Sequence, residues 1–123
     1  MYNGKKLLIV DDSKVERQIL KEIGLLLNFE IFEAETAVEG LAKAEEIIPD
    51  LVLMDVVMPG MNGFQATKQL SLNENLNKIP VIMCTSKNQA VDKVWGMRQG
   101  AKDYIIKPVD KNELIEKIKV LLG

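Results

Sequence analysis

The sequence predicts a doubly wound α/β domain in which helices cover both faces of a five-stranded parallel sheet. Short apolar runs alternate with helical patterns five times along the chain, and the connections between them are short. Three of the runs, LLIV, LVLM and VIMC, are apolar throughout. Strands buried on both faces read as continuous hydrophobic runs, and parallel strands need helical crossovers. These observations together favour a parallel sheet.

The five expected strands differ in polarity. They cover residues 6–10, 30–34, 51–54, 81–84 and 104–107. The second, EIFEA, mixes charged and apolar side chains, which is typical of an edge strand. The first, third and fourth are the most apolar, so we expect them at the centre of the sheet.

A helix is expected after each strand. In residues 13–27, apolar side chains recur with a helical period. The other helices cover residues 38–48, residues 64–72, a segment from Ser86 to Gly100 and a segment ending near Leu122, and Pro49 ends the first of these. Capping-box spacing predicts the five helix starts: Ser13 with Glu16, Thr36 with Glu39, Asn62 with Gln65, Ser86 with Gln89, and Asp110 with Glu113.

Length and charge exclude several classes of protein. The 123 residues suit a single domain over residues 1–123. Sixteen basic and eighteen acidic side chains give a net charge of −2 without a basic block, which argues against nucleic-acid binding. No apolar stretch approaches the roughly 20 residues needed to span a bilayer, and the first residues, MYNGKK, lack a signal-peptide core. We therefore expect no membrane association and a cytoplasmic location.

Two residue types restrict the available chemistry. The single cysteine, Cys84, stands in an apolar run, so we expect a buried, inert thiol in a reducing compartment. The chain has no histidine, which excludes histidine-based triads, histidine-ligated zinc and a phosphohistidine on this chain. Its chemistry must use carboxylates, hydroxyls, lysine and metals that prefer oxygen.

Polar side chains stand at the carboxyl ends of four expected strands: Asp11 and Asp12, Asp55, Thr85 and Ser86, and Lys107 ahead of Pro108. Ligands of such sheets bind at this edge. Carboxylates 4 Å apart repel by roughly 4 kcal/mol per pair at an effective dielectric constant of about 20. A divalent cation and a lysine would relieve that repulsion, and all-oxygen ligands favour Mg²⁺, Mn²⁺ or Ca²⁺. Asp55 then has the surroundings of a nucleophile that forms an aspartyl phosphate.

Each feature taken alone also has a simpler explanation. Asp11 and Asp12 could stabilise a helix dipole, worth about 0.3–1 kcal/mol. Asp55 could be a turn residue, Thr85 with Ser86 a helix cap, and Lys107 a solvated lysine. None of these explanations accounts for the shared position at the carboxyl ends of different strands.

Over its whole length the sequence resembles the receiver domains of two-component response regulators, of the single-domain chemotaxis type. The matching motifs are IVDDS at 9–13, LMDVVMPGMNG at 53–63, PVIMCTS at 80–86 and YIIKP at 104–108. Two further segments resemble the stand-alone receivers of type IV pilus, twitching-motility systems: FQATKQL at 64–70 and VDKVWGMRQGAKDY at 91–104. The resemblance implies a flavodoxin-like sheet with strand order 2-1-3-4-5 and a signalling switch rather than an enzyme.

The resemblance also implies a role for each matching residue. Asp55 would accept a phosphoryl group from a partner histidine kinase or phosphotransfer protein. The ligands of Mg²⁺, or of Mn²⁺ in its place, would be Asp12 directly, Asp11 through water, Asp55, and the backbone carbonyl of Val57. Lys107 would contact the phosphoryl group, and the Lys107–Pro108 bond would be cis.

The output is expected to depend on the fourth strand and on the surface beyond it. Thr85, with Ser86, would bind the phosphoryl group, and Tyr104 would turn inward behind Thr85. The face formed by the fourth helix, fifth strand and fifth helix would then bind a downstream protein. Three candidate contacts are Lys93, Trp95 and Met97, although Trp95 could instead pack against a neighbouring helix.

Two positions depart from the polar pattern of fast-cycling chemotaxis relatives. Val57, two residues after Asp55, offers attacking water no hydrogen bond, and Lys87 stands two residues after Thr85. We therefore expect slow autodephosphorylation, although Val57 could simply suit local packing.

Other functions stay open at this stage. No residue follows Gly123 to form an output domain, so we expect output through a partner protein or use as a phosphate sink for the kinase. An aspartate-nucleophile phosphatase usually has a second aspartate where this chain has Val57. An FMN carrier would need a phosphate cradle where the first loop reads DDSK.

Overall fold

Five parallel strands form one sheet in the order β2-β1-β3-β4-β5 in the computed structural model, which describes residues 1–123. The strands are β1 (Lys6–Val10), β2 (Glu30–Ala34), β3 (Leu51–Met54), β4 (Val81–Thr85) and β5 (Asp103–Ile106). The expected strand order is confirmed, and the charged strand β2 lies at an edge. All of β3 and β4 is buried, as the continuous apolar runs predict.

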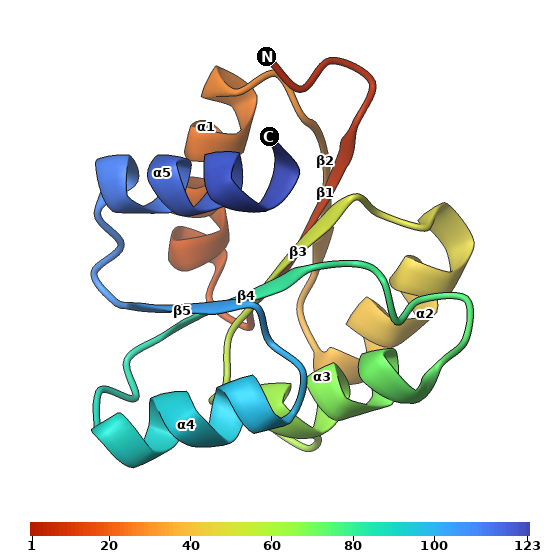
Figure 1. Cartoon of the computed structure of the whole chain (residues 1–123), viewed down its shortest axis with the longest axis vertical. Helices are drawn as coiled ribbons and strands as arrows, with labels where there is room; N and C mark the ends of the chain where they lie inside the picture. The colour runs from red at the N-terminus through yellow and green to blue at the C-terminus, as the bar shows by residue number, and fades with distance from the viewer.

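Helices cover both faces of the sheet (Figure 1). Two of them, α1 (Lys14–Leu26) and α5 (Lys111–Leu122), pack on one face. The other face is covered by α2 (Ala37–Ile47), α3 (Gly63–Leu72) and α4 (Ala90–Arg98). The doubly wound architecture is therefore confirmed.

The core consists of two apolar layers separated by the sheet. On β1, Leu7 and Ile9 belong to the layer under α1 and α5, whereas Leu8 and Val10 belong to the layer under α2 and α3. This alternation follows from the two-residue period of a strand. Cys84 is fully buried in the first of these layers, as expected, and burial raises the pKa of its thiol to about 12.

Most of the predicted helix starts are confirmed. The Ser13 hydroxyl accepts a hydrogen bond from the Glu16 N–H at 3.2 Å, and Thr36 and Asp110 make the same bond to their helices. Asn62 and Gln65 form the complete reciprocal capping box. Each of these caps fixes where the chain turns from the loop at the strand end into the helix.

The predicted cap formed by Ser86 and Gln89 is wrong. The chain continues past β4 as an exposed loop, and α4 begins at Ala90 with Gln89 as its N-cap. The Asp92 carboxylate accepts a hydrogen bond from the Gln89 N–H at 3.2 Å, so an acid in the first helical turn replaces the expected hydroxyl cap. The helix also ends at Arg98 rather than Gly100, because Gly100 adopts a positive φ of 113°.

The boundaries of the last two strands shift by one residue. Thr85 belongs to β4, and β5 ends at Ile106, just before Lys107. The Lys107 N–H still donates to the Thr85 carbonyl at 2.8 Å, so the main chain of Lys107 stays joined to β4. The Lys107–Pro108 peptide bond is cis, as the resemblance implied.

Gly63 allows the first turn of α3 to pack directly on the main chain of Asp55. A Cβ atom at position 63 would lie 1.9 Å from the Asp55 carbonyl oxygen. The Gly63 N–H donates to the Val56 carbonyl at 2.9 Å. The glycine therefore holds the loop after β3 close to the sheet, which fixes where the Asp55 side chain starts.

No helix is both long and apolar enough to cross a membrane.

Candidate functional site

Three carboxylates from two strand ends meet at one rim of the sheet. One oxygen from each of Asp11, Asp12 and Asp55 lies within 4.8 Å of the others. Asp11 and Asp55 are 1% and 6% exposed, whereas Asp12 is open to solvent. The convergence expected from the strand ends is therefore present, and two of the three acids are largely removed from water.

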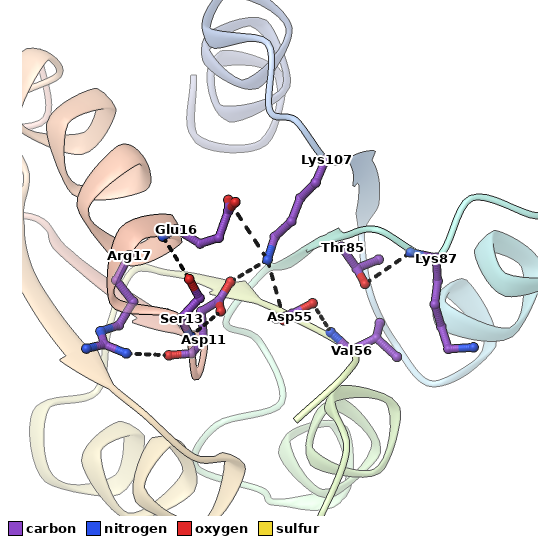
Figure 2. A network of polar contacts seen from close by, with 9 residues as sticks. All are labelled: Asp11, Ser13, Glu16, Arg17, Asp55, Val56, Thr85, Lys87 and Lys107. Carbon is purple, nitrogen blue, oxygen red and sulfur yellow. Dashed lines mark hydrogen bonds and ion pairs between the residues drawn. The ribbon is translucent and has the colours of Figure 1, made fainter. Parts of the chain in front are cut away.

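Lys107 reaches into this group from the end of β5 (Figure 2). Its ammonium nitrogen lies 2.7 Å from Asp11 Oδ2, 3.5 Å from Asp55 Oδ2 and 4.0 Å from Glu16 Oε2. A single cation therefore faces several carboxylates, and the rim keeps an excess of negative charge.

Backbone groups fix the direction of both buried carboxylates. Asp55 Oδ1 accepts a hydrogen bond from the Val56 N–H at 2.8 Å, and Asp11 Oδ1 accepts one from the Ser13 N–H at 2.9 Å. In each residue the other oxygen, Oδ2, faces Lys107. Each carboxylate thus holds one oxygen against the main chain and presents the other at the rim.

The crowding changes the ionisation of Asp55 and Lys107. Burial and the Asp11 charge raise the pKa of Asp55, although Lys107, the Thr85 hydroxyl and the Val56 N–H oppose this. Burial lowers the pKa of Lys107, but its hydrogen bond with Asp11 and the nearby carboxylates outweigh burial and raise that pKa overall. Lys107 is therefore firmly charged, and the negative form of Asp55 is held at an energetic cost.

The donor set fits a hard divalent cation. Three carboxylates converge, no histidine exists in the chain, and the one cysteine is buried within the core. Carboxylate oxygens are the ligands that Mg²⁺ and Mn²⁺ prefer. A cation bound among Asp11, Asp12 and Asp55 would neutralise the charge that Lys107 leaves unbalanced.

The two hydroxyl residues after strand β4 lie in different environments. Thr85 is fully buried beside Asp55, and its hydroxyl accepts a hydrogen bond from the Lys87 N–H at 3.4 Å (Figure 2). Ser86 is exposed and makes no hydrogen bond to the carboxylates. The structure therefore places Thr85, and not Ser86, in the polar network of the rim.

Tyr104 connects the loop after β4 to β5. Its side chain is buried, and its hydroxyl donates to the Lys87 carbonyl at 2.8 Å. Burial, followed by the charges of Asp92 and Asp55, raises the pKa of the phenol to about 12. The loop that carries Lys87 is therefore tied to both Thr85 and Tyr104.

Two of the three candidate output residues on α4 line different depressions in the surface. Trp95 is 49% exposed and lines a groove of about 430 Å³ next to the rim, together with Val57 and Lys87. Lys93 lines a different depression, together with Tyr104 of β5 and Glu113 of α5. Met97 is 40% exposed and lines neither of them. Trp95 is thus a groove residue rather than a core residue.

Two charged residues of α1 belong to the network, although the sequence pattern did not single them out as site residues. Glu16 faces Lys107, and Arg17 is buried with one nitrogen 2.7 Å from the Asp11 carbonyl oxygen. Their only sequence signal is spacing, because they stand one turn after the loop that carries Asp11 and Asp12.

Fold and rim together define a class of protein. A doubly wound sheet with three acids and a lysine at its carboxyl edge agrees with a family comparison, in which residues 7–119 match the response regulator receiver domain. This match covers most of the chain. The chain therefore belongs to the response regulator receiver family, whose members are signalling switches that take phosphoryl groups from kinases.

The relatives in the family include single-domain receivers. Protein PilH of Pseudomonas aeruginosa is 48% identical over 118 residues, which cover 96% of this chain and 98% of PilH. The chemotaxis protein CheY of Listeria monocytogenes is 37% identical over 115 residues, or 93% of this chain and 95% of CheY. By contrast, the chain spans 52% of the regulator PhoB of Pseudomonas aeruginosa, at 35% identity. The expected resemblance to single-domain receivers is confirmed.

Solved structures lead to the same family. The chemotaxis protein CheY4 of Vibrio cholerae superposes with a TM-score of 0.89 at 30% identity, and the match covers 96% of this chain and 98% of CheY4. The flavodoxin-like fold of a single-domain receiver is thereby confirmed.

Replacing Asp55 by asparagine should stabilise the metal-free protein. The raised pKa of Asp55 means that its contribution to stability is present at low pH and is lost as pH rises through that pKa. At pH 7.5 in EDTA we expect Asp55→Asn to have a free energy of unfolding about 1 kcal/mol higher than that of the wild type, which raises Tm by roughly 4 °C. Thermal unfolding followed by circular dichroism measures this difference.

The matched control is Asp110→Asn, which exchanges two equally good caps at an exposed position and should leave Tm unchanged. Added Mg²⁺ should raise the Tm of the wild type more than that of Asp55→Asn, because a cation bound only by the folded state would have all three carboxylates as candidate ligands only in the wild type. A lower Tm for Asp55→Asn in EDTA would mean that attraction to Lys107 outweighs carboxylate repulsion.

Proposed function

We propose that the chain is a phosphorylation-activated switch and that Asp55 is its phosphoryl acceptor. The observation that carries the proposal is the convergence of Asp11, Asp12, Asp55 and Lys107 at one rim. The donor would be a phosphohistidine on a partner kinase or phosphotransfer protein, because this chain has no histidine of its own.

The transfer needs an oxygen of Asp55 to attack phosphorus. An O–P bond forms to the carboxylate, the N–P bond of the phosphohistidine breaks, and its electron pair stays with the imidazole. Asp55 is suited to this step because its ionised form is poorly solvated and its Oδ2 faces the open rim. The hydrogen bond from the Val56 N–H holds the carboxylate in a fixed orientation during the attack.

The remaining charge at the rim would assist the transfer. Bound Mg²⁺ would be held by Asp11, Asp12 and Asp55, with the Val57 carbonyl as a further candidate, and would neutralise phosphoryl charge. Lys107 would exchange its contact with Asp11 for one with a phosphoryl oxygen. Thr85, buried beside Asp55, would donate its hydroxyl to another phosphoryl oxygen.

The structure suggests how the modification would reach a partner protein. The loop after β4 is held by the Thr85 hydroxyl and by the Tyr104 hydroxyl, both through Lys87. If Thr85 turns to the phosphoryl group, the Lys87 N–H loses its acceptor and the loop can rearrange. A switch of this kind shifts only by the difference in interaction between its two states. The output surface would be the α4, β5 and α5 face.

The biological setting belongs to the same proposal. The pilus-type motif at 91–104 and the 48% identity to PilH support a role in a chemosensory system that controls type IV pilus motility, in the cytoplasm. A phosphate sink for the same kinase would use the same site. No feature of the site favours a phosphatase or an FMN carrier, since Val57 stands in place of the second acid and two carboxylates stand within the first loop.

Incubation with acetyl phosphate and Mg²⁺ should add one phosphoryl group to the wild-type chain. Intact-mass spectrometry measures the product, and its hydroxylamine lability identifies an acyl phosphate. Asp55→Ala should take up none, whereas the control Asp50→Ala, at the opposite end of the sheet, should react normally. Equal phosphorylation of Asp55→Ala and wild type would refute Asp55 as the acceptor.

Val57→Asn should shorten the lifetime of the phosphorylated protein. Val57 is 54% exposed at the edge of the groove beside the rim, so an amide there could bind and orient the attacking water. We expect about a tenfold faster loss of the phosphoryl group, which is 1.4 kcal/mol of barrier. Release of inorganic phosphate after removal of the donor measures the rate. An unchanged or slower rate of phosphate release from Val57→Asn would show that Val57 serves packing alone. A slow rate in the wild type would weigh against a role as a phosphate sink.

A further inference from the structure

A buried arginine lies directly behind the acidic rim, and the phosphorylation chemistry proposed above does not use it. Arg17 of α1 is 7% exposed. Its Nη1 donates to the Asp11 carbonyl oxygen at 2.7 Å, and its Nε donates to Glu33 Oε1 at 3.1 Å. Nη2 lies 3.5 Å from Glu35 Oε1 (Figure 2 shows the bond to Asp11).

These contacts join three parts of the fold. Arg17 comes from α1, Asp11 follows the interior strand β1, and Glu33 and Glu35 lie in and just after the edge strand β2. The planar guanidinium can serve all three acceptors at once because its five N–H donors point in fixed directions. Burying a cation is costly without partners, so the two glutamates offset part of the cost of burying the Arg17 guanidinium.

We propose that Arg17 is a positioning residue for the metal ligands, a role that rests on the proposed Mg²⁺-dependent phosphorylation. The carbonyl that Arg17 holds belongs to the peptide group joining Asp11 to Asp12. Two of the three rim carboxylates therefore project from the peptide unit that Arg17 anchors. Arg17 itself contacts neither the carboxylate of Asp11 nor Lys107, since its partners are a backbone oxygen and two glutamates.

Charge and positioning predict opposite results when Arg17 is replaced. Removing a cation close to a cation site should tighten metal binding by simple electrostatics. Loosening the segment that carries two ligands should weaken it, and loss of groups that orient metal ligands typically costs about 10- to 100-fold in affinity. The sign of the change therefore separates the two effects.

The experiment measures Mn²⁺ affinity in the unphosphorylated full chain, from the electron paramagnetic resonance signal of free Mn²⁺. Arg17→Gln should bind about 10- to 100-fold more weakly than the wild type. Arg17→Lys keeps the charge but can serve only one acceptor well, so its Mn²⁺ affinity should lie between those of the wild type and Arg17→Gln. Lys14→Gln removes an exposed cation from the same helix and should bind as well as the wild type or slightly better.

Each outcome decides the question. Melting temperatures in EDTA establish which variants are folded, and if Arg17→Gln is not, Arg17→Lys decides alone. Affinity equal to or tighter than wild type in the deciding variant would overturn the positioning role while leaving the proposed function intact. Failure of the wild type to bind Mn²⁺ would overturn both. Weaker binding by folded Arg17 variants, with Lys14→Gln unaffected, supports the role.

Discussion

Repulsion among Asp11, Asp12 and Asp55 is the constraint on which the rest of the site depends. Lys107 can neutralise only part of that charge, and at 2.7 Å it lies closer to Asp11 than to Asp55 at 3.5 Å. Asp55 is therefore the less compensated of the two buried acids, and burial raises its pKa. A site in this condition gains from added positive charge, so a divalent cation bound here would relieve the repulsion and would also offset the negative charge of the phosphoryl group proposed to join Asp55.

The fold maintains this crowding instead of relaxing it. Parallel strands bring the three acids and Lys107 to one edge, and main-chain N–H groups hold one oxygen of each buried carboxylate. Gly63 lets α3 press on the Asp55 backbone, and Arg17 anchors the peptide group between the other two acids. Stability is thus spent on holding like charges together, as is common where a site serves function more than folding.

Much of the architecture follows from the sequence because it depends on local patterns. The apolar runs identify β3 and β4, and the polar residues at strand ends identify Asp55 and Lys107. The start of α4 differs from the sequence prediction, because Ser86 and Gln89 have the spacing of a cap whereas residues 86–89 form an exposed loop after Thr85. The partners of Arg17 come from other elements of the fold, so no local sequence pattern predicts these contacts.

A crystal structure of the chain determined with Mg²⁺ and beryllofluoride would test the central claim most directly. The account predicts a metal ion among Asp11, Asp12 and Asp55, with beryllofluoride on Asp55 and the Lys107 ammonium turned from Asp11 toward a fluoride. A metal bound away from this rim, or a Lys107–Asp11 pair unchanged beside an unmodified Asp55, would contradict it.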